Sequence, residues 1–451
     1  MPAEPRTISE LAQALASRRL TAEAATTHCL EAIADRNSSV NAFIAVFADE
    51  ARAQARQADA DIAAGRYRGP LHGVPVSLKD LFDVEGVRTT AASRVRSNHV
   101  ANVDSTVVQR LRAAGAVLIG KNNLHEFALG TTNQDSAFGP ARHPLDLGRS
   151  PGGSSGGSAA AVLAGMAYAS IGTDTGGSVR IPAGVCGLVG LKPALGEIPT
   201  DGVVPLSPTL DHVGPICRSA GDATILYHVL RGQHAAARKP VRERGIRLGV
   251  LRGYFMALLD AGVASTFEQA CTRLQGAGVE LRDAIIPHAD DISTIYVHIA
   301  LTEAAAYHAA TLERRPDDYT PNVRLRLEMG RYILGEDYVR AMRGREVLRT
   351  EVDQALKDCD ALLLPTLPVP ATRLGAETVH IGGSDQSVRT VMLRLTQLFN
   401  ITGHPAITMP CGSTAEDLPV GAQLVGAKDG TRGLLDVAEA LEPYLGPGVS
   451  R

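Results

Sequence analysis

Two glycine- and serine-rich stretches constrain this chain more than any other feature of its sequence. They run from Gly152 to Ser158 (GGSSGGS) and from Gly172 to Ser178 (GTDTGGS), and an alanine-rich apolar segment separates them. Glycine loses more backbone freedom on folding than any other residue, so this density is costly unless the chain needs positive φ or must lie against a ligand. We therefore predict two specialised loops, with a tightly packed buried helix between them.

Both loops end at a serine and offer backbone N–H groups that no bulky side chain obstructs. Successive N–H groups in a glycine-rich turn can point into one concavity and hold an anion. The tetrahedral oxyanion of acyl transfer needs donors of this kind. A serine that follows such a turn is therefore well placed to act as a nucleophile.

A serine hydroxyl needs an activating base before it can attack. The usual base is a histidine oriented by a carboxylate, but the sequence offers no neighbourhood that suggests one. Lys79 is the alternative, because it ends the apolar stretch Val74–Leu78 and would be partly desolvated there, which favours the neutral amine. Taken alone, this lysine fits the role of a paired structural cation equally well.

The composition argues against several other classes of protein. Apolar residues make up 45% of the chain, charged residues 21%, and the net charge is −3, so no basic face for a nucleic acid is expected. The segment Met1–Leu20 is polar and lacks the apolar core of a secretory signal. The longest apolar run, 159–172, is shorter than the ~20 residues of a membrane span. We expect a cytoplasmic enzyme without membrane contact.

The spacing of apolar residues predicts an α/β fold. Helices are expected at 22–33 (with Thr21 as N-cap), 51–65, 107–113, 264–276, 302–314 and 337–357. Short strands are expected at 73–79, 116–120, 361–365, 406–410 and 421–425. This alternation is typical of a sheet covered by helices. We predict one domain over residues 1–451, with a helical excursion at about 245–357.

The cysteines are scattered and contain no C-x-x-C pair, so neither a disulfide framework nor a zinc site is expected. We interpret them as small buried apolar residues. No metal and no cofactor is predicted. The cysteines in question are Cys29, Cys186, Cys217, Cys271, Cys359 and Cys411.

The two loops and the lysine segment closely resemble the amidase signature family. The matching block consists of GGSSGGSAAA (152–161), GTDTGGSVRIPA (172–183) and CGLVGLKP (186–193). Further similarity lies in LHGVPVSLKD (71–80), GKNNLHEF (120–127), DHVGP (211–215), 399–412 and 418–426, which together span nearly the whole chain. The resemblance implies an α/β/α sandwich with a central mixed, mostly parallel sheet that helices cover on both faces.

The resemblance also implies a catalytic triad. Ser178 matches the nucleophile, Ser154 matches a serine that follows a cis peptide bond and relays protons, and Lys79 matches the general base. The oxyanion hole would be formed by the backbone N–H groups of Thr175, Gly176, Gly177 and Ser178.

Three further residues are expected to support the loops. Asp174 and Arg180 flank the second loop and are interpreted as a structural salt bridge, and Ser155 as a donor that steadies the first loop. Ser155 also completes a short G-x-S-x-G pattern, which would fit an α/β-hydrolase with His404 as its base. That pattern is short and leaves the second glycine loop unexplained.

The activity implied is hydrolysis of acyl C–N bonds other than peptide bonds, through a covalent acyl-enzyme. Amides, anilides, carbamates (urethanes) and urea-like compounds are the candidate substrates, and a homodimer is a candidate assembly. The substrate pocket is expected near Ser207–Leu210 and Ile295–Tyr307. Arg326, Arg389 or Arg394 could bind a carboxylate, although solvation at the surface is the simpler expectation for each.

Two other functions stay open. The A subunit of an aminoacyl-tRNA amidotransferase resembles this chain strongly, hydrolyses glutamine and works beside a tRNA-binding partner. Its segment corresponding to Val388–Thr402 does not look like the one here, and the chain is somewhat short. A catalytically inactive binding protein of the same fold is disfavoured, because all three triad positions are intact.

Overall fold

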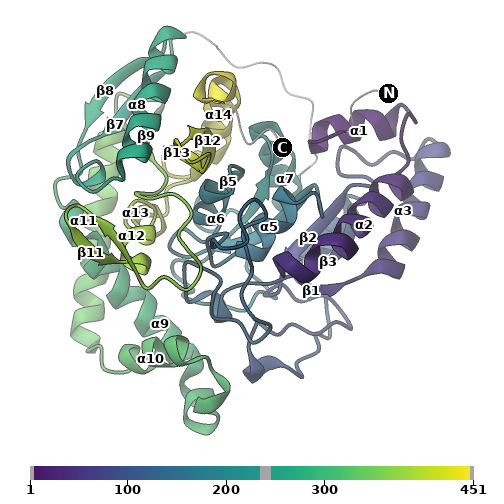
Figure 1. Ribbon diagram of the computed structural model, residues 1–451, viewed down its shortest axis with the longest axis horizontal. Helices are drawn as coiled ribbons and strands as arrows, with labels where there is room; N and C mark the ends of the chain where they lie inside the picture. Colours follow the sequence, from purple (N-terminus) through teal and green to yellow (C-terminus); the bar gives the residue numbers. More distant parts are fainter. Residues whose placement is uncertain (1–4, 234–244, 447–451) are drawn as a thin grey trace.

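The computed structural model describes residues 5–233 and 245–446. Its centre is an eleven-stranded sheet in the order β1-β3-β2-β4-β6-β5-β12-β13-β9-β7-β8. Helices near the N-terminus lie at one end of the molecule, and β7, β8 and the helix beside them lie at the other (Figure 1). The strands, in sheet order, are β1 (Phe43–Val46), β3 (Val117–Asn122), β2 (Pro75–Lys79), β4 (Ala169–Asp174), β6 (His212–Cys217), β5 (Val189–Lys192), β12 (Ala406–Ser413), β13 (Pro419–Val425), β9 (Ala361–Pro365), β7 (Arg247–Leu251) and β8 (Glu280–Ala284).

The sheet is mixed, as predicted, but it is not mostly parallel. Parallel pairing occurs where β2 meets β3 and β4, and where β7 meets β8 and β9. The other six neighbouring pairs are antiparallel. In the middle of the sheet β12 runs into β13 through the short loop 414–418, a connection that only antiparallel neighbours allow. The expectation of a mostly parallel sheet is therefore wrong there.

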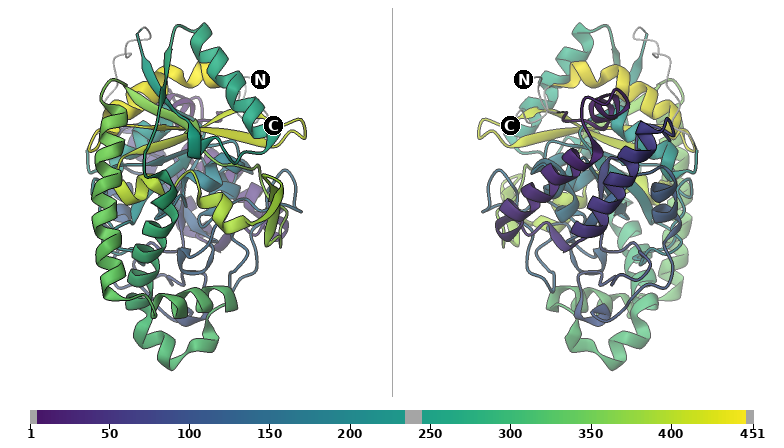
Figure 2. Two further views of the ribbon diagram at one scale, coloured as in Figure 1. Left: turned by 90° about the vertical axis from the view of Figure 1, so that its left-hand side faces the viewer. Right: turned by 90° about the vertical axis from the view of Figure 1, so that its right-hand side faces the viewer.

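Helices cover both faces of this sheet (Figure 2). Strand β9 contributes side chains to the apolar core on each face of the sheet. Ala361 and Leu363 belong to one apolar cluster, whereas Leu362 and Leu364 belong to the other. Side chains alternate between the faces of a strand, so a strand covered on both sides is apolar throughout. The helices are α1 (Ile8–Ala16), α2 (Ala22–Val40), α3 (Ala48–Ala63), α4 (Thr106–Ala113), α5 (Gly156–Leu163), α6 (Arg180–Val185), α7 (Ala220–Leu230), α8 (Ala261–Gly276), α9 (Ile292–Arg314), α10 (Pro321–Gly330), α11 (Gly335–Leu356), α12 (Val388–Leu393), α13 (Leu398–Thr402) and α14 (Thr431–Leu445).

The stretch predicted as a helical excursion is only partly helical. It contains α8 to α11, but it also contributes β7 and β8 to one end of the sheet. Strand β8 was not predicted because it is a polar edge strand, with no buried residue among Glu280–Ala284. A two-stranded hairpin of β10 (Thr378–Ile381) and β11 (Ser384–Ser387) leads into α12.

Several local predictions are confirmed. The Thr21 hydroxyl accepts a hydrogen bond from the Ala24 backbone N–H at 3.1 Å and so caps α2. Five of the cysteines are buried, and Cys359 is half-buried; all six carry free thiols. Within the two described ranges, no helix is both long and apolar enough to cross a lipid bilayer.

The buried helix between the two glycine loops is α5, in which all eight residues are buried. It covers only the first part of the apolar run 159–172, because the end of that run forms strand β4. The first turn of α5 lies so close to the strand ends that no side chain could replace its glycines. A Cβ atom on Gly157 would lie 2.3 Å from the backbone oxygen of Asn123. The glycines of the first loop therefore allow α5 to pack directly against the backbone that follows β3.

Candidate active site

Lys79 is the last residue of β2, and its side chain is completely buried. Strands β2 and β4 are parallel neighbours, with Leu78 opposite Ile171, so their carboxyl ends meet at one edge of the sheet. The Nζ atom of Lys79 lies 2.8 Å from the Thr173 Oγ1 atom near the end of β4. The parallel pairing thus brings an amine and a hydroxyl together inside the protein.

The same amine contacts the first loop. Lys79 Nζ lies 2.7 Å from Ser154 Oγ, and Ser154 is also completely buried. The peptide bond between Gly153 and Ser154 is cis. Burial lowers the pKa of Lys79 from 10.5 to about 7, although the charges of Asp174 and Asp211 act to raise it. Near neutral pH a large fraction of this amine is therefore uncharged and can accept a proton.

The second loop presents unused donors. Between β4 and α6, the backbone N–H groups of residues 175–178 make no hydrogen bond with any described residue. The Ser178 backbone oxygen accepts a hydrogen bond from Ser155 N at 3.2 Å, which joins the two loops. Ser178 itself is 5% exposed. Four successive free N–H groups beside a serine are the arrangement that an oxyanion hole requires.

Two glycines of this loop leave no room for a larger residue, because other side chains lie directly against them. A Cβ atom on Gly176 would lie 2.4 Å from Tyr296 Oη, and one on Gly177 would lie 2.3 Å from Thr396 Oγ1. Gly177 also has a φ of +134°, which disfavours any other residue. The Thr396 hydroxyl donates to the Gly176 backbone oxygen at 2.6 Å. The loop is therefore held from outside while its N–H groups stay free.

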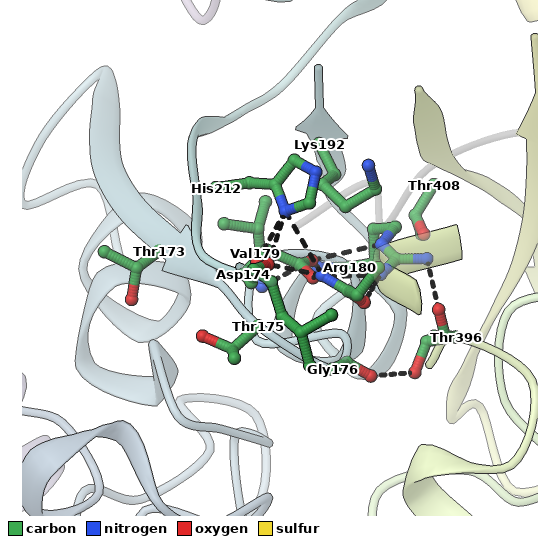
Figure 3. A network of polar contacts seen from close by, with 12 residues as sticks. Thr173, Asp174, Thr175, Gly176, Val179, Arg180, Lys192, His212, Thr396 and Thr408 are labelled. Atoms are coloured by element: carbon green, nitrogen blue, oxygen red, sulfur yellow. Dashed lines mark hydrogen bonds and ion pairs between the residues drawn. The ribbon is translucent and has the colours of Figure 1, made fainter. Parts of the chain in front are cut away.

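A buried ion pair between Asp174 and Arg180 links the two flanks of the turn in the second loop (Figure 3). Arg180 Nη2 lies 2.9 Å from Asp174 Oδ1, Arg180 Nε lies 3.0 Å from Asp174 Oδ2, and neither side chain is exposed. Burial opposes ionisation of the carboxyl, but the Arg180 guanidinium holds the pKa of Asp174 well below its usual range. Asp174 Oδ2 also accepts from the N–H of Val179 at 3.1 Å, at the start of α6. The salt bridge expected from the sequence is present.

Residues far along the chain complete this ion pair. Asn400 and Gln423 lie in the family-like segments 399–412 and 418–426, but no role is predicted for either from the sequence. Arg180 Nη1 donates to Gln423 Oε1 at 2.6 Å and to the Thr396 backbone oxygen at 2.9 Å. Arg180 Nη2 donates to Asn400 Oδ1 at 2.6 Å. The one signal that could have found them is a polar residue inside an otherwise apolar segment. Gln423 is an example, because it is buried within β13.

A second carboxyl, which is half-buried, holds Thr175, the first residue whose backbone N–H is free. Thr175 Oγ1 donates to Asp211 Oδ1 at 2.6 Å, and the N–H groups of Leu206 and Ser207 donate to Asp211 Oδ2 at 2.9 and 3.1 Å. Burial raises the pKa of Asp211 to about 6. A cavity of about 220 Å³ adjoins Asp211 and Thr173, with Leu81, Ala128 and Pro208 among its lining residues.

The α/β-hydrolase alternative finds no support in this geometry. Ser155 Oγ donates to the Thr173 backbone oxygen at 3.3 Å, a contact between the first loop and β4. The ring nitrogens of His404 lie instead 2.9 Å from Thr402 Oγ1 and 3.0 Å from Asp353 Oδ1. The histidine that this alternative needs is therefore engaged elsewhere.

The amidase family model matches residues 24–435. The chain belongs to the amidase signature family. An amidase from Pseudomonas putida is 40% identical to it over 428 residues, which cover 91% of this chain and 90% of that protein. The A subunit of glutamyl-tRNA(Gln) amidotransferase from Anaeromyxobacter sp. (strain K) is 38% identical over 453 residues, with the same coverage of 91% and 90%.

Solved structures agree with this membership. A crystal structure described as that of an amidase superposes on this amidase-family chain with a TM-score of 0.92 at 36% identity, and covers 98% of this chain and 100% of its own. The A subunit of glutamyl-tRNA(Gln) amidotransferase from Thermotoga maritima superposes with a TM-score of 0.78 at 34% identity, covering 97% and 94%. The α/β fold and the enzyme family expected from the sequence are thus confirmed.

Proposed function

We propose that this protein is a serine amidohydrolase that cleaves acyl C–N bonds, with Ser178 as nucleophile, Ser154 as proton relay and Lys79 as general base. The observation that supports this most strongly is the 2.7 Å contact between Lys79 Nζ and Ser154 Oγ. The amine in this contact is buried, has a lowered pKa and lies at the carboxyl ends of β2 and β4. The buried Lys121 differs from Lys79 in having a carboxylate partner, Asp80, at 2.8 Å.

The reaction begins with proton transfer through the triad. The neutral amine of Lys79 takes a proton from Ser154 Oγ, which in turn takes one from Ser178 Oγ. Ser178 Oγ then attacks the carbonyl carbon of the substrate. The negative charge that develops on the carbonyl oxygen is stabilised by the free N–H groups of residues 175–178.

The proton then returns to the leaving group. It passes from Lys79 through Ser154 to the substrate nitrogen, because an amide anion is a very poor leaving group. The C–N bond breaks, the amine departs and Ser178 carries an acyl ester. Water attacks this ester with the help of the same relay, which releases the acid and restores the Ser178 hydroxyl.

Amides, anilides, carbamates and urea-like compounds all have the carbonyl–nitrogen bond that this scheme cleaves. The proposed restriction to bonds other than peptide bonds rests on the resemblance noted above. A small molecule as the substrate, a homodimer, the lack of a nucleic-acid partner and a cytoplasmic location remain predictions.

The test is a screen of the purified chain against aliphatic amides, anilides, carbamates and glutamine, with Ser178→Ala as the matched control. We expect turnover of at least one class by the wild-type chain alone, and none by Ser178→Ala. Equal turnover by both proteins would contradict the proposal.

A second candidate function is hydrolysis of glutamine as the A subunit of an amidotransferase. The 38% identity to such a protein over 91% of this chain favours it. The same screen separates the two functions. Glutamine hydrolysis that appears only beside a partner protein supports the second, and turnover of anilides or carbamates by the isolated chain supports the first.

A further inference from the structure

Arg389 belongs to α12, and another residue of this helix packs against the loop that carries the free N–H groups. Arg389 stands one turn before Leu393, and residues four apart in a helix share a face. Leu393 Cδ2 would lie 3.0 Å from a Cβ atom on Gly176, which places this face of α12 against the loop. Tyr296, whose hydroxyl contacts the same glycine, is also an electrostatic neighbour of Arg389.

The other side of Arg389 meets the segment that supports Ser154. Arg389 Nη1 lies 3.4 Å from the Leu129 backbone oxygen. A few residues later the same segment packs on the first glycine loop, because a Cβ atom on Gly153 would lie 2.8 Å from Thr132 N. Arg389 is only partly exposed. Its guanidinium therefore lies between the supports of the two loops that form the proposed active site.

This guanidinium lacks a counter-charge within the described ranges. No carboxylate there lies within 4.0 Å of Arg389, nor of Arg326, a second arginine whose charge acts on it. Asp135, the acid whose charge acts on Arg326, already lies 3.1 Å from His125 Nε2 and 3.3 Å from Asn322 Nδ2. Burial and the charge of Arg326 lower the pKa of Arg389 to about 10, so it stays charged at neutral pH.

The contrast with Arg180 is informative, since that buried guanidinium is neutralised by Asp174. Removing a charge from water without a partner is costly, and a substrate anion is the partner that the chain itself does not supply at Arg389. A guanidinium holds a carboxylate through two parallel hydrogen bonds.

We propose that Arg389, with Arg326 behind it, binds a carboxylate of the substrate, so that the site prefers amides that carry a free carboxylate group. This replaces the simpler expectation of solvation at the surface. It rests on the proposed function and narrows its substrate class.

The test compares matched substrate pairs: succinamate with butyramide, and glutaramate with valeramide. The quantity of interest is the ratio of kcat/KM for the acid amide to kcat/KM for the neutral amide. We expect this ratio to exceed one in the wild-type protein and to fall about 10- to 100-fold in Arg389→Ala, the range for losing a hydrogen bond to a charged group. Arg389→Lys should give an intermediate ratio, because lysine keeps the charge but loses the paired donors.

Arg343→Ala is the matched control, because Arg343 is an exposed arginine on α11, and it should leave the ratio unchanged. A wild-type preference for the neutral amides, or an equal loss on both amides in Arg389→Ala, would overturn the proposal. If neither pair is hydrolysed, the binding of succinate and glutarate, measured by calorimetry, tests the carboxylate site instead. Binding that Arg389→Ala abolishes supports the carboxylate site, and no binding to the wild-type protein overturns it.

The failure of this inference is distinguishable from the failure of the proposed function. Hydrolysis that needs Ser178 but shows no preference for acid amides leaves the hydrolase intact and removes only the role of Arg389. Hydrolysis that survives Ser178→Ala removes the proposed function, whatever the substrate preference is.

Discussion

The amine of Lys79 lies 2.7 Å from the hydroxyl of Ser154, and both side chains are completely buried. They come from segments 75 residues apart in the sequence. The pairing depends on β2 and β4 running parallel, so that both strands end at the same edge of the sheet. The proposed chemistry follows from this contact, because a desolvated amine loses its proton readily and can then take one from its neighbour.

The first prediction concerns the pH dependence of catalysis. The pKa of Lys79 is lowered to about 7, and only the neutral amine can accept a proton. We therefore expect kcat/KM to rise with pH through about 7 and to level off above it. A pH–rate profile of the wild-type protein checks this. An inflection near 10.5, the ordinary value for lysine, would show that burial does not tune this amine.

The second prediction concerns stability and the same group. Lys79 has a lower pKa in the folded than in the unfolded chain, so the unfolded chain binds more protons between about 7 and 10.5. The contribution of Lys79 to the free energy of unfolding must therefore rise with pH across that window. Lys79→Met removes this contribution.

Denaturant unfolding at several pH values measures the difference. We expect the stability of the wild-type protein relative to Lys79→Met to increase as the pH rises from about 7 towards 10.5. A difference that is constant with pH would mean that the amine is protonated equally in both states.

The third prediction concerns the ion pair behind the second loop. Arg180→Met leaves the Asp174 carboxylate buried without its cation, and breaking such a pair costs about 3–5 kcal/mol. We expect this loss in the free energy of unfolding, measured with denaturant. The exposed Arg343→Met on α11 is the control and should change stability by less than about 0.5 kcal/mol. An equal, small effect of both substitutions would show that the pair contributes little.

The fourth prediction concerns the shape of the second loop. In Gly177→Ala the new Cβ atom would lie 2.3 Å from Thr396 Oγ1, and the φ of +134° would be strained. We expect the N–H groups to move and kcat to fall by about 100-fold or more, as when one oxyanion donor is lost. Gly276→Ala, where the space around the new atom is open, should keep full activity. Steady-state kinetics of both variants make the comparison.

The sequence predicted the α/β class and strands β2, β3, β9, β12 and β13, but it did not predict β1, β4, β5, β6 or β7. Strand β9 was predicted at its observed ends from the apolar run Ala361–Pro365. Strand β8 was missed because it is polar, and the direction of the central strands was misjudged because pairing depends on connections that composition does not reveal.

The candidate site was predictable only where its residues lie in continuous motifs. Lys79, Ser154 and Ser178 fall in such motifs, and the structure brings the first two into contact. Tyr296, Thr396 and Gln423 reach the second loop or its ion pair from distant elements. No sequence spacing encodes such contacts, since they depend on how helices and strands pack in three dimensions.

We propose that Ser178, rather than Ser155, is the nucleophile that Lys79 activates through Ser154. The most direct measurement is labelling of the purified chain with a fluorophosphonate, followed by peptide mass spectrometry to locate the adduct. We expect an adduct on Ser178 that is lost in Ser178→Ala, is much reduced in Lys79→Ala and persists in Ser155→Ala. An adduct on Ser155 or on another side chain, or unchanged labelling without the Lys79 amine, would contradict it.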